Sequence, residues 1–138
     1  MKSSSWESGL ESSRSEVKNS IKHVAFFVYP VRDMAASRQF YEGILGLKLE
    51  KDHEGHWLEY NIQGATLAIT DWLENARPCA NGPSLALEVA HADALFEFFR
   101  LNRVTILRPL FETPICHMGV VADPDGNSLI IHQAKTAS

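Results

Sequence analysis

The sequence predicts an α+β protein of two tandem βαβββ modules, whose strands form a curved mixed sheet around a central cleft. Three observations predict it. Each half of the chain opens with an apolar strand, continues with an amphipathic helix and closes on hairpin strands. The openings, at 22–28 and 83–89, are offset by about 61 positions, and the closings, at 64–70 and 126–132, by about 62. Such a repeat indicates two equivalent units that bury their apolar faces together.

The composition excludes several classes of partner. The 138 residues fit one domain, which we place at 21–134, and the formal net charge is −4. Without a block of basic residues, we expect no nucleic-acid partner. The longest apolar runs have the length of a strand, so we expect no membrane span.

The first twenty residues differ from the rest. Residues 1–20 are rich in Ser, Glu and Lys and lack the apolar core and cleavage site of a secretory signal. We interpret them as a flexible tail, with a nascent helix that serves as a partner arm as the alternative. Cys79 and Cys116 are then expected to be free thiols in a reducing cytoplasm. Cys116 precedes His117, but neighbours on a strand point to opposite faces, which disfavours a nucleophilic pair.

Module one is predicted at 21–72. Its first strand ends at Pro30, Asp33 caps the following helix, and Gly46 ends that helix. Turn residues separate the strands that follow. Its strands are expected at 22–29, 47–51, 57–62 and 65–71. A linker at 73–82, with Pro78 and an Asn-Gly turn signal, leads to the second copy.

Module two is predicted at 83–134. A strand at 84–90 leads into a helix near 92–102, and Asp-Pro-Asp-Gly-Asn at 123–127 is a strong tight-turn sequence. Pro109 and Pro114 are expected to fall between strands, where a missing N–H does little harm. The remaining strands are expected at 105–108, 116–121 and 128–132.

Two segments carry a family likeness. The sequence RDMAASRQFYEGILGL at 32–47 resembles the opening helix of the vicinal-oxygen-chelate superfamily, and VADPDGNSLI at 121–130 resembles its other hallmark. This superfamily contains glyoxalase I, extradiol dioxygenases, fosfomycin resistance enzymes and the bleomycin resistance proteins. The likeness covers 21–133 and implies the fold of that group, although one fold hosts many functions.

The resemblance also implies where a metal would bind. Enzymes of this group hold a divalent metal through His or Glu on the first and last strands of each module. In this chain those four positions are His23, Ser84, Ala68 and Ile130, and His23 alone is a good ligand for Zn, Fe, Mn or Ni. We therefore expect no metal cofactor. The alternative is a site rebuilt from His23, Glu88 and His132, with the last strand slipped by two residues.

The cleft offers other chemistry. If His23 and Ser84 point inward, alternation brings Phe27 and Tyr29 to the same side as Thr66, Ala68 and Thr70. His23 and Glu88 are the candidate catalytic groups, because a low-dielectric cleft raises the pKa of a carboxyl and makes it a base. Each also has a structural reading, His23 as a core histidine and Glu88 as an exposed edge residue. The predicted ligand-binding residues are His23, Phe27, Trp57, Glu59, Thr66, Thr70, Ser84, Glu88 and His132.

Three functions remain open at this point. The favoured one is a protein that binds a small organic molecule without metal, similar to the bleomycin resistance proteins. The alternative is an enzyme: a metal-dependent lyase or dioxygenase of the glyoxalase or extradiol type, built around His23, or an isomerase that works by Glu/His proton transfer. A third is a dimerisation scaffold with an unused cleft. A homodimer is expected in each case, because the sheet edges of this layout need covering.

Overall fold

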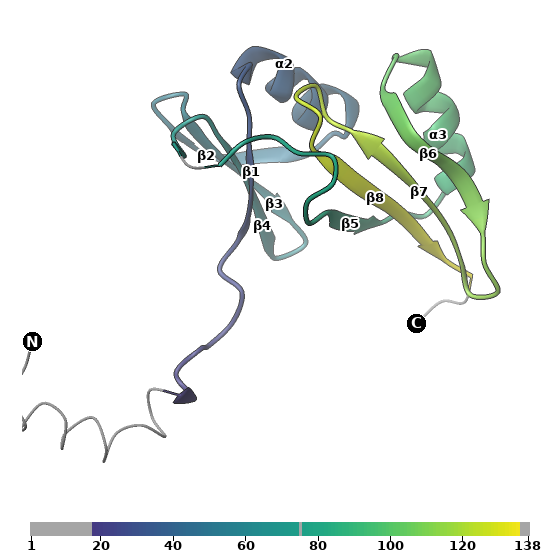
Figure 1. Ribbon diagram of the computed structural model, residues 1–138, viewed down its shortest axis with the longest axis horizontal. Coiled ribbons are helices and arrows are strands. Elements are labelled where there is room, and N and C mark those ends of the chain that lie inside the picture. The colour runs from purple at the N-terminus through teal and green to yellow at the C-terminus, as the bar shows by residue number, and fades with distance from the viewer. Residues whose placement is uncertain (1–17, 75, 136–138) are drawn as a thin grey trace, which may run out of the picture.

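The computed structural model describes residues 18–74 and 76–135 (Figure 1). It confirms the predicted fold class: two βαβββ modules follow each other along the chain. Each module forms its own four-stranded mixed sheet, with strand orders β1-β4-β3-β2 and β5-β8-β7-β6. Most of the predicted tail, residues 1–17, lies outside the described residues. In the part of the chain that is described, no helix has the length and apolar character needed to cross a membrane.

Module one runs from β1 to β4. The Asp33 carboxylate caps the helix by accepting a hydrogen bond from the Ala36 N–H at 3.0 Å, as the sequence predicts. The helix begins as α2 and continues as a π-helical segment, η1. The 3.6-residue spacing of apolar residues does not predict this change of helix type. Gly46, at φ +71°, follows its end. The elements are β1 (Phe27–Pro30), α2 (Met34–Arg38), η1 (Gln39–Ile44), β2 (Lys48–His53), β3 (Trp57–Ile62) and β4 (Ala65–Thr70).

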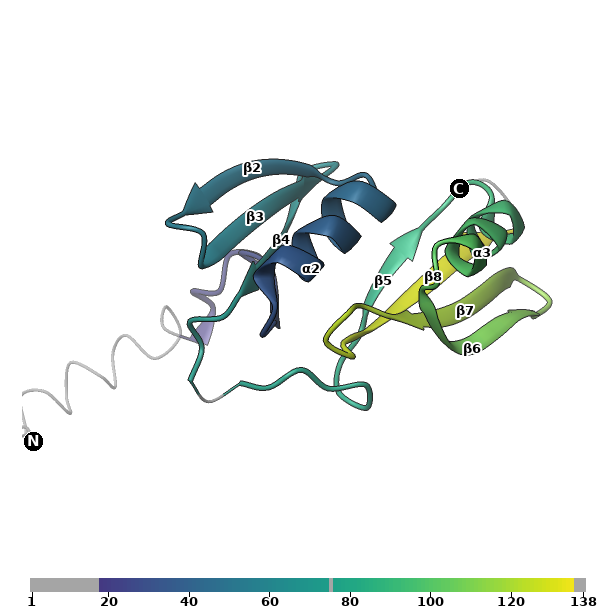
Figure 2. The same ribbon diagram turned by 90° about the horizontal axis from the view of Figure 1, so that it is seen from above.

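Module two repeats this order. Its helix buries Phe96 and Phe99 against the sheet. Residues 123–127 form the turn between its last two strands. The elements are β5 (Leu85–Glu88), α3 (Ala92–Leu101), β6 (Thr105–Glu112), β7 (Cys116–Ala122) and β8 (Ser128–Ala134). Figure 2 shows each helix lying on one face of its own sheet, so each sheet keeps one face without a helix.

The first strand differs from the prediction in length and in facing. Strand pairing begins at Phe27, and residues 22–26 lead up to it as an exposed segment without strand structure. The parallel register places Phe27 beside Leu67 and Tyr29 beside Ile69, both on the helix-covered face. The predicted shared face with Thr66, Ala68 and Thr70 is therefore wrong for Phe27 and Tyr29.

The proline prediction fails at one of its two positions. Pro109 lies inside β6, whereas Pro114 falls between β6 and β7 as expected. β6 tolerates the proline because it is the edge strand of its sheet, and its register shifts between Arg108 and Phe111.

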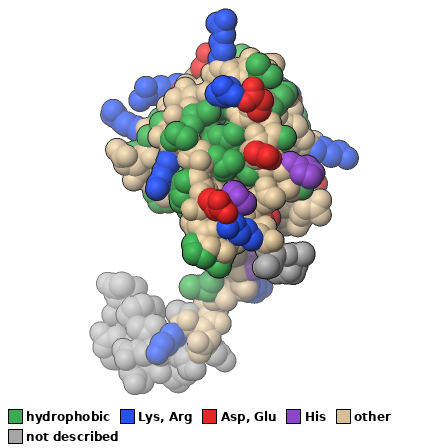
Figure 3. All heavy atoms as spheres, turned by 90° about the vertical axis from the view of Figure 1, so that its right-hand side faces the viewer, with side chains coloured by type: hydrophobic (Ala, Val, Ile, Leu, Met, Phe, Trp, Pro, Cys, Tyr) green, Lys and Arg blue, Asp and Glu red, His purple; other side chains and the backbone are tan. Residues whose placement is uncertain are grey.

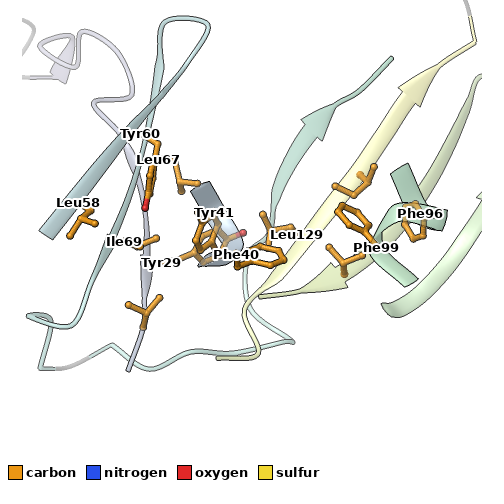
Figure 4. Packing of buried hydrophobic residues seen from close by; sticks show 13 residues of the cluster. Tyr29, Phe40, Tyr41, Leu58, Tyr60, Leu67, Ile69, Phe96, Phe99 and Leu129 are labelled. Atoms are coloured by element: carbon orange, nitrogen blue, oxygen red, sulfur yellow. The ribbon is translucent and has the colours of Figure 1, made fainter. Parts of the chain in front are cut away.

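Tyr29 joins the two modules. Its hydroxyl donates to the Ser128 carbonyl at 2.7 Å and accepts from the Leu85 N–H at 2.7 Å. It therefore bridges β5 and β8, paired strands of the other module. Figure 4 shows Tyr29 and Tyr41 on the module-one side of this junction, with Leu129 of β8 beside them. The two modules thus share one hydrophobic core.

Candidate functional site

A cavity of about 390 Å³ lies between the modules. From module one, residues of β1, of the connection between η1 and β2, and of β3, β4 and their turn line it. From module two, residues of β5, α3 and β8 line it. The apolar side chains that line it include Leu45, Leu47, Ile62, Leu85, Leu87 and Leu95. Small-molecule sites in proteins commonly have this volume and this apolar character.

Strand β5 gives the cavity its polar edge. β5 lies at the edge of its sheet, and register places Leu85 and Leu87 on the helix-covered face beside Leu129 and Ile131. Ala86 and Glu88 point to the other face, yet both also line the cavity. The edge of β5, at Ala86 and Glu88, therefore borders the cavity.

Three of the nine predicted ligand-binding residues line this cavity: Phe27, Thr66 and Glu88. His132 lies one hydrogen bond away, because its Nδ1 is 2.5 Å from the Glu88 Oε1. Register places Glu88 and His132 directly opposite each other on β5 and β8, as the predicted common face requires.

The electrostatics of Glu88 differ from the prediction. A hydrogen bond from the Ala134 N–H at 2.8 Å, together with the one from His132, holds the pKa of the Glu88 carboxyl below its ordinary value. The expected raised pKa is therefore wrong, because the carboxylate is exposed and its two oxygens accept these bonds. Glu88 stays ionised and is a poor base at neutral pH.

Trp57 and Glu59 lie elsewhere, on the helix-free face of the first sheet. The Trp57 indole donates from Nε1 to the Glu59 Oε2 at 2.9 Å and meets the Phe26 ring edge-on, with centroids 5.5 Å apart. Neither Trp57 nor Glu59 lines the cavity. The two predicted residues therefore form an aromatic and acidic surface of their own.

The remaining three candidates have other surroundings. His23 lies in the exposed segment before β1. The hydroxyl of Ser84 bonds to that of Ser128, and the buried Thr70 hydroxyl donates to the His56 carbonyl at 2.7 Å. The hydroxyl groups of Ser84 and Thr70 thus make local structural hydrogen bonds, and neither residue lines the cavity.

The donor set does not fit a divalent metal. Of the four positions that the family likeness implies, Ala68 and Ile130 carry no donor atom, and the Ser84 hydroxyl is bonded to Ser128. Within 18–74 and 76–135, no three His, Cys, Asp or Glu side chains gather in a group that would hold a metal ion. The free thiols predicted for Cys79 and Cys116 are confirmed, one exposed and one buried.

Sequence reasoning missed most of the apolar lining. Leu45, Leu47, Leu85, Leu87 and Leu95 have the spacing of ordinary core residues, and a cavity wall has the same pattern. The cavity exists because of how the two modules pack against each other, and the spacing of apolar residues does not specify that packing.

A model of the Glyoxalase/Bleomycin resistance protein/Dioxygenase superfamily matches residues 20–131. The chain belongs to this superfamily. The match spans both modules and confirms the likeness that residues 32–47 and 121–130 carry. A search of curated proteins found no match.

Solved structures of the superfamily are similar over most of their length. TnmS3, an antibiotic binding protein from Streptomyces sp. CB03234, shares 29% identity with a TM-score of 0.72, over 83% of this chain and 98% of its own. A glyoxalase/bleomycin resistance protein from the same organism shares 28% identity with a TM-score of 0.67, over 80% and 100%. A lactoylglutathione lyase from Agrobacterium tumefaciens, at 18% identity and a TM-score of 0.64 over 82% and 94%, shares the fold.

Proposed function

We propose that this protein binds a small, largely apolar organic molecule in the cavity between its modules, without the divalent metal of its enzymatic relatives. The observation that carries the proposal is the cavity itself: about 390 Å³, walled by leucines, with one carboxylate at its edge. Such a site removes the apolar surface of a ligand from water and offers few side chains that could act as acids, bases or nucleophiles.

The similar structures support the same class of function. TnmS3 is described as an antibiotic binding protein, and its similarity covers nearly all of its own chain. The enzyme alternative has less support. Its metal-dependent form is built around His23, which lies in an exposed segment before β1 rather than in the cavity. Its isomerase form needs Glu88 or His23 in proton transfer, and the lowered pKa of the Glu88 carboxyl makes it a weak base.

Filling the cavity tests the proposal. Leu87 is half-buried and lines the cavity from the helix-covered face of β5, so Leu87→Trp places an indole in the binding space. We expect it to lower the affinity for 4-nitroanisole, an uncharged aromatic probe, by tenfold or more, roughly the effect of losing one buried ring contact. Ala94→Trp, on the exposed side of α3, is the matched control. Equal calorimetric affinity in wild type, Leu87→Trp and Ala94→Trp would place binding outside this cavity.

The absence of a metal requirement has its own test. Calorimetric titration with Zn²⁺, Fe²⁺, Mn²⁺ and Ni²⁺ is expected to show no tight stoichiometric uptake, and a chelator is expected to leave probe binding unchanged. Tight uptake that His23→Ala abolishes would support the metalloenzyme alternative instead.

We also propose that the protein is a homodimer, with the cytoplasm as its location. The segment before β1 is apolar and exposed, with Ile21 at 88% and Val24 at 71% exposure, and Figure 1 shows it extending away from both sheets. It continues directly into β1, an edge strand, so a second copy is the partner that covers both the segment and the edge.

Light scattering tests the dimer. Val24→Lys introduces a charge into this apolar segment and is expected to shift the protein toward monomer, whereas Lys22→Arg leaves the mass unchanged. A monomeric wild type at high protein concentration would contradict the dimer.

A further inference from the structure

Strand β5 borders the cavity along its backbone. Residues 85–89 all line the cavity, although successive side chains of a strand point to opposite faces of a sheet. Consecutive residues share one wall when the edge of the strand, rather than one of its faces, borders the space. β5 is an edge strand and pairs with β8 alone among the described strands. The edge of β5 that faces away from β8 therefore forms one wall of the cavity.

The hydrogen bonds to β8 identify the backbone groups at this open edge. The Val89 N–H donates to a carbonyl of β8 at 2.8 Å, and the Leu85 N–H is linked to another carbonyl of β8 through the Tyr29 hydroxyl. The N–H and C=O of one residue point to the same side of a strand, and those of the next residue point to the other side. Ala86 and Glu88 therefore present their N–H and C=O groups to the cavity.

The other edge strands of the two described sheets differ from β5. β2 carries Lys48 and Lys51 and a shift in register, and β1 is the edge that we assign to the dimer. β6 contains Pro109 and shifts in register, and Figure 3 shows hydrophobic side chains gathered on the side that carries α3 and β6, with charged side chains around them. Lysine, proline and bulges keep edge strands from pairing further. β5 has no proline, no lysine and no shift in register, so its edge remains available.

Module one offers a second stretch of open strand. β1 begins at Phe27, opposite Leu67, so Ala65 and Thr66 pair with β3 alone. Residues 65–67 all line the cavity, as residues 85–89 do. The cavity thus has strand backbone on both of its sides.

The cavity therefore combines leucine side chains with polar backbone groups. A hydrocarbon ligand would remove these N–H and C=O groups from water without giving them partners, which costs free energy. An extended peptide supplies donors and acceptors with the matching repeat of two residues, and its alternate side chains reach the apolar wall. Three residues of extended chain span about 10 Å, and residues 85–89 are long enough to pair along them.

We propose that the ligand of this cavity is a short apolar peptide, bound in extended conformation as an additional strand along the open edge of β5. The inference rests on the proposed function, because the same cavity holds the ligand, and it assigns the chemical class of that ligand. The backbone of Ala86 and Glu88 binds the peptide backbone, and the side chains of Leu85 and Leu87 contact its apolar side chains.

Methylation of the peptide backbone tests the proposal. The probe is acetyl-Leu-Ala-Leu methylamide, an uncharged tripeptide, titrated calorimetrically into the full-length protein. Two isomeric variants carry an N-methyl group on the second or on the third residue. Adjacent N–H groups of a strand point to opposite sides, so one variant loses a donor to β5 and the other does not. We expect the affinities of the two variants to differ by about tenfold, as the loss of one backbone hydrogen bond predicts. Equal affinities would overturn the proposal.

A substitution in β5 tests the same hydrogen bonds from the side of the protein. Ala86→Pro removes the N–H that faces the cavity and leaves the bonds to β8, because an edge strand tolerates proline where its N–H lies outside the ladder. Ala86→Val has a side chain of similar size and keeps the N–H. We expect Ala86→Pro to bind the tripeptide about tenfold more weakly than Ala86→Val, and equal affinity would contradict the proposal. The methylated peptides decide the question if Ala86→Pro does not fold.

Hydrogen exchange identifies what covers the edge. In the free protein, we expect the Ala86 and Glu88 amides to exchange faster than the Leu87 and Val89 amides, which face β8. Saturating tripeptide is expected to slow exchange at Ala86 and Glu88 by tenfold or more. Protection of both amides in the free dimer, lost on dilution to monomer, would show that a second copy covers this edge and that the proposal is wrong.

The outcomes distinguish this inference from the proposed function. If 4-nitroanisole binds in the cavity but the tripeptide does not bind, the ligand class is overturned and the cavity remains a binding site. If neither compound binds, the proposed function fails, and this inference fails with it.

Discussion

At the scale of single residues, a buried carboxylate organises the turn between β7 and β8. Asp123 is 3% exposed and accepts hydrogen bonds from the Tyr41 hydroxyl at 2.8 Å and from the Asn127 N–H and side-chain amide at 2.8 and 2.9 Å. A buried charge is tolerated only when its lone pairs are used in this way. Burial, together with this negative charge, raises the pKa of Tyr41. The phenol therefore stays protonated and keeps donating.

The Glu88 carboxyl gives a prediction that depends on pH. Its pKa is held below the ordinary 4.5 by the Ala134 N–H first and by His132 second. A carboxyl with a depressed pKa stabilises the fold above its unfolded pKa, and this contribution is lost as the pH falls through the folded value. In His132→Gln we expect the Glu88 pKa, followed by carboxyl NMR, to rise only part of the way toward 4.5, because the Ala134 N–H remains. A full return to 4.5 would contradict the ranking of the two hydrogen bonds.

At the scale of elements, α3 packs on its sheet through a notch at Gly119. A Cβ added there would lie 2.5 Å from the Phe96 ring and 3.1 Å from the Arg108 carbonyl oxygen. Neither neighbour has room to move, because Phe96 is a core ring and the carbonyl belongs to β6. β7 therefore needs glycine at the point where the helix crosses it.

Gly119→Ala is expected to lower the free energy of unfolding by about 1–3 kcal/mol through overpacking. Gly43→Ala is the control, since its added Cβ meets only the flexible Gln39 side chain and replaces a glycine within a helix. Urea denaturation measures both. Phe96→Leu shortens the opposing side chain, so the cost of Gly119→Ala should be smaller in that background. Additive effects of the two substitutions would show that the ring is not the obstacle.

The order of elements was predictable from the sequence, and most of their boundaries fall within two residues. Period-two and period-3.6 patterns, the Asp33 cap and the turn at 123–127 locate strands and helices by local physics alone. The facing of β1 was not predictable in this way. That strand is apolar on both sides, so alternation does not reveal which side the helix covers. Its start at Phe27 depends on where β4 can pair with it.

The candidate site was harder to predict than the fold. The alternation of side chains along a strand predicts that Glu88 and His132 lie on the same face of the sheet. The structure brings them together. The cavity does not follow from any local pattern, because its walls come from both modules and its leucines look like core. His23 appeared central because it alone kept a ligand type that the family uses, but the structure places it outside the cavity.

At the scale of the whole molecule, side-chain hydrogen bonds join the modules across long stretches of sequence. The Asn127 amide donates to the Pro30 carbonyl at 2.8 Å and accepts from the Cys79 N–H at 3.1 Å. The last turn therefore holds β1 and the linker together. With Tyr29, these contacts make the modules one cooperative unit.

Tyr29→Phe removes a hydroxyl that satisfies two backbone groups, the Leu85 N–H and the Ser128 carbonyl. We expect a loss of about 2 kcal/mol in the free energy of unfolding, because buried groups left without partners are costly. The hydroxyl of Tyr60 donates to the partly exposed Glu42 carboxylate, so Tyr60→Phe should cost less. Hydrogen exchange should accelerate at the Leu85 amide in Tyr29→Phe only. An unchanged rate there would mean that the hydroxyl does not protect this amide.

The two hydrogen bonds of the Tyr29 hydroxyl also determine what happens when the chain is cut between the modules. These bonds span 99 and 56 positions, so the backbone groups of Ser128 and Leu85 in the second module have this partner only when the first module is present. A backbone cut within residues 73–82 would leave two fragments, each missing part of its own interior. Neither fragment would fold stably by itself. Mixing the two fragments would restore the folded protein.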